Sequence, residues 1–239
     1  MYYQVSCTNS GSLASVVQCL ETMNQFVRLD IDPSGLRVQS VDHDDTTLMT
    51  YTLPVLSIGG ICVRSSINMR CDQILQFLLC THGDIHIGID SDPTIWSVRD
   101  SSGQSCLWST GRQLPNHHDI PASISGYAVC IPSVDFLLYV QHISLCESYV
   151  RVSSHGTNDV TLSSDGELIS IRIQNQPVVH DGTEIVVVQC TFKYIRAVLS
   201  IIQKSVKLDM FITDGTCVNI NVPMATGTLS IILKDKTVH

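Results

Sequence analysis

The chain repeats the order of its predicted elements at about half of its length, and this repeat limits the folds open to it. A comparison of the sequence with itself at an offset of about 122 residues aligns the two halves. Apolar residues at helical spacing predict two helices in each half, over 11–20 and 72–80, then over 132–143 and 192–202. Strands with turn residues between them complete each half, so both halves read as helix, strands, helix, strands.

The predicted strands come as hairpins. Alternating apolar residues around turns rich in Gly, Pro, Ser and Asp predict hairpins over 26–41, 84–98, 149–162 and 206–220. The first helix has Ser10 or Ser12 as its expected cap. Two short helices against many antiparallel strands are typical of an α+β domain with its helices on one face of the sheet.

A segment without clear periodicity separates the halves. It covers 112–125 and contains Pro115 and Pro121, so we read it as a connector. We therefore expect an N-terminal domain over 1–111 and a C-terminal domain over 126–239. Two unrelated α+β domains are the alternative, which the shared order of elements disfavours.

Composition narrows the class of protein. The formal net charge of −8 argues against a simple basic nucleic-acid binder, although a few cations can still gather on one surface. No apolar run approaches the roughly 20 residues that span a bilayer, and we see no secretory signal. The ten cysteines include no C-x-x-C pair, which disfavours a structural zinc site. We expect free, mostly buried thiols in a reducing compartment, several of them in apolar stretches (Cys19, Cys80, Cys130 and Cys190).

Several segments, taken in order, resemble a known family. The best match is the hairpin Asp30-Ile-Asp-Pro-Ser-Gly-Leu-Arg-Val-Gln-Ser-Val-Asp42, followed by a strand over 47–53. Further similarity lies in 120–121, 131–136, 164–168 and 227–233. These segments resemble the eukaryotic and archaeal DNA sliding clamp, proliferating cell nuclear antigen. The resemblance covers nearly the whole chain with few gaps.

The resemblance implies a ring of three two-domain subunits, with helices lining a central hole and sheets forming the outer wall. The edge strand near 105–112 of one subunit would pair with the edge near 167–174 of the next. Such a ring slides on duplex DNA, tethers DNA polymerase and other replication and repair proteins, and depends on a clamp loader. The resemblance thus implies a homotrimeric processivity factor in the nucleus, or at a site of viral DNA replication, that is no enzyme and needs no cofactor.

The predicted helix over 192–204 carries the best candidates for DNA contact. Lys193, Arg196 and Lys204 fall in one stripe opposite its apolar face, and Arg70 begins the second helix. On a helix that faces DNA, such cations make phosphate contacts that do not depend on base sequence. An ordinary solvated helix face is the alternative.

The other helices depart from the family pattern, in which all four carry several lysines and arginines. The matching faces here are nearly uncharged and offer Ala14, Ser15, Gln18, Glu21, Gln73, Gln76, Gln141 and His142. Because fewer cations make fewer phosphate contacts, we expect weak contact with DNA. Retention on DNA would then depend on ring closure more than on attraction.

A partner-peptide groove is the second candidate site. In the family, a peptide with a glutamine, an aliphatic residue and two aromatic residues docks under the connector, beside the C-terminal segment. The positions that match are Val41, Leu48, Ile120, Pro121, Ile124, Thr216, Ile232 and Leu233. Apolar residues from three distant segments suit a shallow pocket for aromatic anchors. The alternative is that the first-half residues are core and the last ones simply finish a strand.

Two departures from the family affect this groove. Lys234 and Asp235 follow the last apolar pair, where the family has Ala-Pro. His117 and His118 stand in the connector, where an aliphatic anchor is common. We therefore expect partner peptides that differ from the usual motif.

Catalytic and metal-binding chemistry have little support in the sequence. The segments 42–45 and 117–119 contain metal-ligand residue types, but both lie in predicted turns, where polar residues are usual. No phosphate-binding loop or nucleophile-elbow motif occurs. We predict no metal and no catalytic residue. The remaining alternatives are a subunit of a heteromeric checkpoint-type clamp, a monomeric or dimeric clamp, an α+β adaptor that does not bind DNA, and a metal-assisted hydrolase using these turns.

Overall fold

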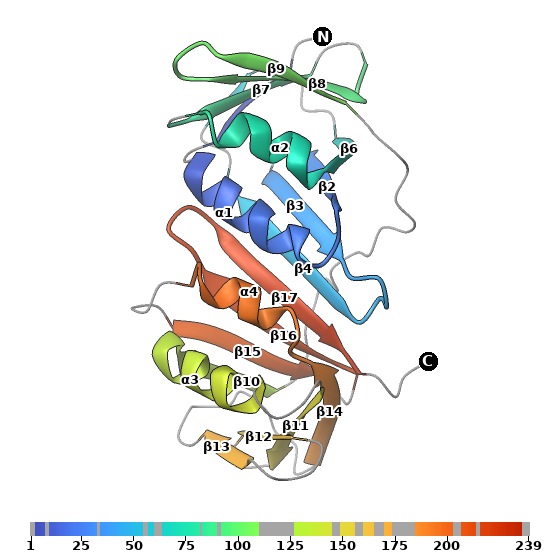
Figure 1. The fold of residues 1–239 in the computed structure, drawn as a ribbon, viewed down its shortest axis with the longest axis vertical. Coiled ribbons are helices and arrows are strands. Elements are labelled where there is room, and N and C mark those ends of the chain that lie inside the picture. The colour runs from blue at the N-terminus through green and yellow to red at the C-terminus, as the bar shows by residue number, and fades with distance from the viewer. Residues whose placement is uncertain are drawn as a thin grey trace. The chain divides into compact units, whose positions relative to one another are not determined.

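The computed structural model divides the chain into two units (Figure 1). The residues that it describes are 3–7, 10–32, 34–54, 57–59, 64–81, 83–89, 92–109, 127–144, 149–155, 160–164, 170–173, 185–202, 207–213 and 216–235. The first unit takes 1–40, 50–117 and 225–228, and the second takes 41–49, 118–224 and 229–239. Each half of the chain therefore builds most of one unit. The predicted domain bounds stay a prediction, because residues 110–126 lie outside the described ranges.

The first unit combines two helices with two sets of strands. Its elements are β1 (Tyr3–Cys7), α1 (Ser10–Glu21), β2 (Phe26–Asp32), β3 (Gly35–Val41), β4 (Thr47–Leu53), β5 (Ser57–Gly59), β6 (Ser65–Arg70), α2 (Cys71–Leu78), β7 (Ile85–Ile89), β8 (Ile95–Asp100) and β9 (Ser105–Ser109). One set has the order β5-β1-β7-β8-β9, and the other has the order β6-β2-β3-β4. Figure 1 shows α1 and α2 side by side on one face of the strands.

The sequence pattern of the first unit explains its elements. In α1, apolar residues at helical spacing are buried, among them Leu13, Val17 and Leu20. In β2, every second residue is buried, which is the pattern of a strand with one face on the core. The predicted helix and hairpin are confirmed here. Ser10, one of the two expected caps of this helix, is instead the first residue of α1. Its hydroxyl donates to Thr81 O at 3.3 Å.

The second unit has the same kinds of elements. They are β10 (Tyr127–Pro132), α3 (Ser133–Ser144), β11 (Tyr149–His155), β12 (Val160–Ser164), β13 (Ser170–Ile173), β14 (Ile185–Thr191), α4 (Ile195–Leu199), β15 (Lys207–Thr213), β16 (Cys217–Pro223) and β17 (Thr228–Lys234). One set of strands has the order β13-β12-β11-β14, and the other has the order β10-β15-β16-β17. In Figure 1, α3 and α4 lie over β15 and β16.

The strand pairings confirm the internal repeat. In the first unit β7 pairs with both β1 and β8, and in the second β15 pairs with both β10 and β16, all antiparallel. Likewise β2 pairs with β3 and β6, while β11 pairs with β12 and β14. Apart from β5, each described strand of the first unit thus has a counterpart in the second. The chain has the predicted α+β fold of two similar halves.

Two helices of the second unit differ from the prediction. The helix expected over 192–204 is short, because α4 covers only Ile195–Leu199. Backbone bonds of the i to i−3 type flank it, from Ile195 N to Phe192 O and from Ile201 N to Val198 O. Such tight turns replace α-helical geometry where no side chain caps the end, and Tyr194 at the N-cap makes no cap bond. In α3, two of the residues at the predicted apolar spacing, Val134 and Leu138, are exposed.

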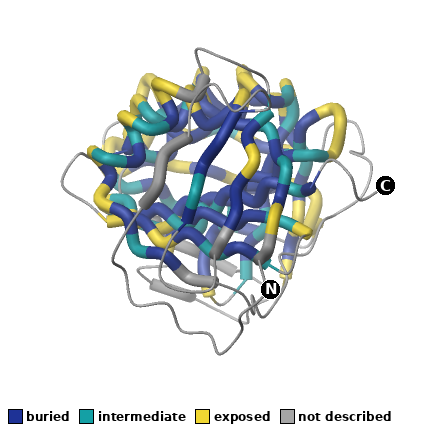
Figure 2. Tube along the Cα trace, turned by 90° about the horizontal axis from the view of Figure 1, so that it is seen from below, coloured by how far each residue is buried: buried dark blue, intermediate teal, exposed yellow. Residues whose placement is uncertain are grey.

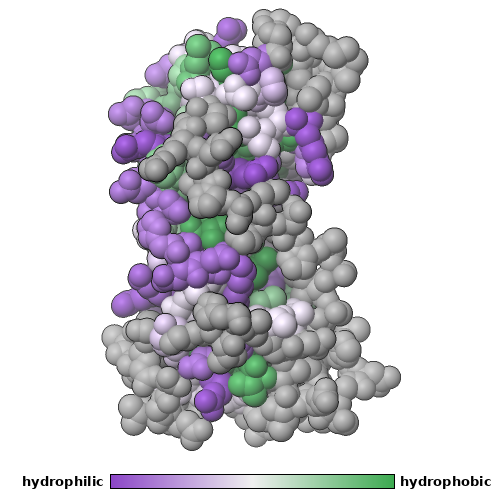
Figure 3. Space-filling model, turned by 90° about the vertical axis from the view of Figure 1, so that its right-hand side faces the viewer, coloured by the Kyte–Doolittle hydropathy of each residue, from purple (hydrophilic) through white to green (hydrophobic). Residues whose placement is uncertain are grey.

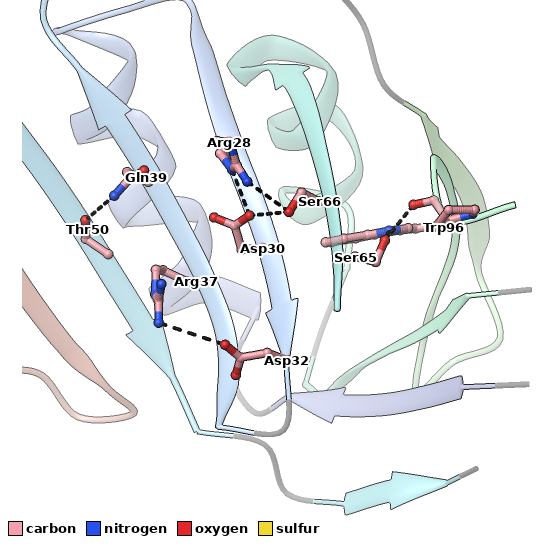
Figure 4. Close-up of polar contacts among 10 residues, drawn as sticks. Arg28, Asp30, Asp32, Arg37, Gln39, Thr50, Ser65, Ser66 and Trp96 are labelled. Carbon is pink, nitrogen blue, oxygen red and sulfur yellow. Dashed lines mark hydrogen bonds and ion pairs between the residues drawn. The ribbon is translucent and has the colours of Figure 1, made fainter. Parts of the chain in front are cut away.

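Buried residues fill the interior of each unit, while exposed residues gather on loops and outer helix faces (Figure 2). Among the largest buried side chains are Trp96, Trp108, Tyr51 and Phe136. Near the core of the first unit, the Trp96 indole N–H donates to Ser65 Oγ at 2.8 Å (Figure 4). Such pairing offsets the cost of burying a polar group.

The described cysteines are free thiols. Of the four cysteines named from the sequence, Cys19 and Cys190 are buried as expected, Cys130 is partly exposed and Cys80 is exposed in the turn that follows α2. Cys71 is also buried, whereas Cys106 and Cys217 are partly exposed. No helix among the described residues is long and apolar enough to cross a bilayer.

Candidate DNA-facing helices and partner groove

The helix pair of the first unit presents a polar and nearly neutral surface. Gln18 and Glu21 of α1 and Gln73 and Gln76 of α2 are exposed, as the sequence predicted. Ala14, expected on the same face, is buried. Figure 3 shows one side of the molecule, where hydrophilic side chains predominate over hydrophobic ones among the described residues. These amides can hydrogen-bond but add no positive charge to the helix surface.

Arg70, the DNA-contact candidate of the first unit, is paired with a carboxylate. Its Nη2 lies 2.7 Å from Asp72 Oδ2, and its Nε donates to Asp72 Oδ1 at 3.1 Å. The hydrogen bond from Arg70, helped by its charge, holds the pKa of Asp72 below its usual range. Because Asp72 stays ionised, it compensates the charge that Arg70 would offer to a phosphate.

Of the three candidates for the stripe in the second unit, Lys193 and Arg196 lie among the described residues. Arg196 lies in α4, is exposed and makes no ion pair with a described residue. Lys193 precedes the helix, and its Nζ lies 4.9 Å from the centre of the Tyr194 ring. Tyr194, and then the carboxylates of Asp44 and Asp42, raise the pKa of Lys193. Lys193 therefore lies under the influence of the acidic turn after β3, and Lys204 falls outside the described residues.

The charges on the four helices agree with the expectation that the helix surface carries few cations. Within α1, α2, α3 and α4 there is one arginine, Arg196, against three carboxylates, Glu21, Asp72 and Asp135. On α3, the His142 ring Nδ1 lies 2.7 Å from the Leu138 carbonyl oxygen. The four helices together have more acidic than basic side chains, so Coulomb attraction to phosphates is small.

The described part of the predicted groove lies in the second unit. Val41 is half-buried and Thr216 is exposed. Leu48, Ile232 and Leu233 are 3%, 5% and 0% exposed, so their side chains offer little free surface. Ile120, Pro121 and Ile124 lie outside the described residues. The groove therefore stays a prediction, with Val41 and Thr216 as its accessible described positions.

The turn between β3 and β4 is a rigid rim beside these residues. The Asp42 carboxylate accepts three hydrogen bonds, from the backbone N–H groups of Thr46 and Thr47 and from the Thr46 hydroxyl, at 2.7–2.9 Å. Asp45 has a left-handed backbone with φ of 56°. The Asp42 side chain thus closes the turn by accepting hydrogen bonds from backbone N–H groups. Among the described residues, no three His, Cys, Asp or Glu side chains gather as a metal site would require.

Lys234 and Asp235 hold the end of β17 in place. Lys234 N–H donates to Thr46 O at 2.8 Å, and its Nζ lies 3.0 Å from Asp45 Oδ1. Asp235 N–H donates to Thr216 O at 2.8 Å, and its Oδ2 accepts the Gln189 N–H at 3.1 Å. The sequence marked these two residues as departures from a family pattern but gave no sign of their partners, which are far away along the chain. Their role is to fix the rim of the candidate groove.

The edge strand β9 is a third surface of interest. It ends its sheet, and Leu107 at its middle is 72% exposed. One hollow of about 400 Å³ lies between β9 and α2, with Gln73, Gln76 and Phe77 in its wall. A second hollow lies on the other side of β9 and is described below. An edge strand with an exposed leucine and a hollow on each side is suited to pairing with another strand.

Solved structures with the same fold are sliding clamps. The chain matches a PCNA from Thermococcus kodakaraensis with a TM-score of 0.75 and 10% sequence identity, over 98% of this chain and 100% of that one. It matches a chain of the PCNA2–PCNA3 complex from Sulfolobus tokodaii with a TM-score of 0.70 and 9% identity, over 98% and 99%. No protein-family model and no curated protein matches the sequence. The chain thus has the PCNA-like sliding-clamp fold.

Proposed function

We propose that the protein is a sliding clamp, a ring that encircles duplex DNA and tethers a DNA polymerase and other replication or repair proteins. The observation that carries this proposal is that β9 and β13 are each the terminal strand of a sheet among the described residues. In the internal repeat, β9 is the counterpart of β17, and β13 is the counterpart of β4.

Within the second unit, Lys234 N–H donates to Thr46 O at 2.8 Å, and within the first unit the Tyr51 hydroxyl lies 2.9 Å from Thr226 Oγ1. We infer that β9 of one copy suits β13 of a second copy. Head-to-tail pairing of this kind gives a closed ring when the rotation closes. Three copies of 26.3 kDa give a ring of about 79 kDa.

The nearly neutral helices favour retention by topology. A ring held on DNA by closure needs no strong phosphate contact, and few cations mean a shallow dependence on salt. Arg196 is then the main described contact, and Arg70 contributes less while Asp72 neutralises it. We propose no enzymatic step for the protein. We also propose that the protein works with a clamp loader, in the nucleus or at a site of viral DNA replication.

A topological assay tests the proposal directly. Primer extension is measured with and without the protein on a circular template and on an open-ended linear template of the same sequence. A ring that slides raises processivity on the circle and slides off the linear ends. Equal effects on both templates, or no effect on either, would refute the tethering function.

Ring closure is tested separately by sedimentation. Leu107→Asp puts a charge at the centre of the β9 edge and is expected to abolish assembly. Leu79→Asp is the matched control, because Leu79 is 61% exposed at the end of α2 and lies away from that edge. Equal masses for both variants and the unchanged protein would mean that β9 is not the subunit junction.

A heteromeric ring is the second candidate, and one observation favours it. The solved structure from Sulfolobus tokodaii is a complex of two different chains, PCNA2 and PCNA3, with this fold. If the protein alone stays near 26.3 kDa at every concentration, but assembles when a second clamp-fold chain is added, the heteromer replaces the homotrimer.

A further inference from the structure

The outer face of the β7–β8–β9 sheet carries an organised polar surface. Strand register sets His86, Arg99 and Ser105 opposite one another in one row across the three strands. The next row on the same face contains Gly88, Ser97 and Leu107. All six line a hollow of about 610 Å³.

The floor of this hollow is open because Gly88 has no side chain. Ser97 Oγ donates to Gly88 O at 3.1 Å, so the serine side chain lies down over the neighbouring strand. A Cβ at Gly88 would lie 2.6 Å from Ser97 Oγ and would displace it. Arg99 and the exposed Leu107 thus border a space that a larger residue at position 88 would fill.

The charge of this hollow stands out in an acidic chain. Of the described residues that line it, none is acidic, while Arg99 and His86 are both potential donors to an anion. Arg99 is exposed and forms no ion pair with a described residue. By contrast Arg28, Arg37, Arg70 and Lys234 each pair with an aspartate (the first two are in Figure 4).

In the proposed ring, the strand that docks on β9 is β13 of a second copy, and this strand carries a positive charge of its own. Strand β13 has the sequence Ser-Ile-Arg-Ile, so Arg172 is the one charged residue within the strand. Pairing of β9 with β13 from a second copy would therefore add a further arginine to the sheet that contains Arg99. Like charges brought together at a junction cost free energy unless an anion lies between them.

We propose that the hollow is an oxyanion site, with Arg99 as its principal ligand, and that a bound phosphate group favours closure of the ring. A guanidinium offers two parallel donors that match phosphate geometry, and His86 and Ser105 can add further donors. The ligand is a phosphate group, free or carried on a small molecule, and Leu107 supplies apolar contact for the rest of such a molecule. The assembly part rests on the proposed ring closure, whereas the binding part does not.

Binding is tested with inorganic phosphate on the whole protein at constant ionic strength, which keeps general screening equal. The readout is the NMR shift of the backbone amides of the residues that line the hollow, which every variant retains. Arg99→Gln is expected to weaken phosphate binding at least about tenfold, since it removes charge-assisted hydrogen bonds. The control is Arg64→Gln, because Arg64 is an exposed arginine of the same unit that does not line the hollow. Equal affinities for the two variants would overturn the site.

Assembly is tested by sedimentation in phosphate and in chloride at the same ionic strength. Phosphate is expected to strengthen assembly of the unchanged protein, and Arg99→Gln is expected to assemble equally well in both salts. Equal assembly of the unchanged protein in both salts would overturn the anion link but leave the ring intact. No assembly in either salt would overturn the ring closure and the anion link together.

Discussion

Lys234 Nζ lies 3.0 Å from Asp45 Oδ1, so the end of the last strand is joined to the turn between β3 and β4. The neighbouring Asp235 continues this connection, with its N–H on Thr216 O and its carboxylate on the Gln189 N–H. The segment after β17 is therefore fixed to three other parts of the second unit. Two charged residues thus hold the rim of the candidate groove in one position.

The first prediction concerns Asp235. It is 6% exposed, so Asp235→Ala leaves the partly buried Gln189 N–H without this acceptor. Loss of such a bond costs about 1–3 kcal/mol in free energy of unfolding, which urea denaturation measures. Asp235→Asn keeps an acceptor oxygen and should cost less.

Lys234→Ala is the control for Asp235. Its ammonium group and the Asp45 carboxylate are both partly exposed, and such pairs contribute about 0–1 kcal/mol. An unfolding midpoint for Asp235→Ala that equals that of Lys234→Ala would contradict the role given to the buried carboxylate.

The second prediction concerns Asp72 and the DNA surface. Asp72→Asn removes the negative charge beside Arg70 and frees the guanidinium for phosphate contact. The slope of log affinity against log salt should then steepen by up to about 0.9 for one added phosphate contact. Fluorescence anisotropy with duplex DNA at several salt concentrations measures it. An unchanged slope, with Arg196→Gln lowering it, would mean that only the α4 helix contacts DNA.

The same pair predicts a pH dependence. The pKa of Asp72 is lowered in the folded protein, chiefly by the hydrogen bond from Arg70. Its contribution to stability is therefore present above the ordinary carboxyl pKa, about 3.9, and is lost as pH falls through the lowered value. Acid titration of stability should show a smaller loss in Asp72→Asn than in the unchanged protein.

Local pattern was enough to predict most of the elements. The helix over 11–20 and the hairpin over 26–41 were placed to within a few residues, because hydrophobic periodicity and turn residues act over short distances. The repeat was visible because both halves use the same order of such patterns. Helix α4 was predicted too long, since apolar spacing continues through Ile201 and Ile202 while the backbone there forms tighter turns.

Long-range partners were beyond the reach of a single sequence. Nothing local indicates that Lys234 faces Asp45, or that Asp44 lies near enough to affect Lys193. The stripe predicted on 192–204 assumed one continuous helix and took no account of the acidic turn beside it. Charge pairs across 40 or more residues depend on the fold, so they can be assigned only after the strands are in register.

The third prediction concerns thiol reactivity. Burial raises the pKa of Cys71 to about 12 and also raises the pKa of Cys190, so both remain protonated and shielded near neutral pH. Cys80 is exposed and should react first with iodoacetamide. Alkylation followed by mass spectrometry should find label on Cys80 in the native protein, and on Cys71 and Cys190 only after unfolding. Rapid native labelling of Cys190 would contradict its burial.

The last prediction concerns Gly227, which lies where β17 begins. A Cβ at this position would overlap the carbonyl oxygen of Thr52 and lie 3.2 Å from Tyr51 Cε2. Because the obstacle is backbone, Gly227→Ala must push the two strands apart, at a cost of about 1–3 kcal/mol in free energy of unfolding.

Gly103→Ala separates this clash from the cost of a left-handed backbone. Gly103 has a φ of 91° and open space where a Cβ would stand, so its substitution adds backbone strain alone, roughly 1–2 kcal/mol. The two variants then differ in a second measurement, native-state hydrogen exchange. Gly227→Ala should speed exchange of the amides in β4 and β17, whereas Gly103→Ala should affect only the β8–β9 turn. Unchanged exchange in β4 and β17 would show that these strands do not approach as closely as the Thr52 contact requires.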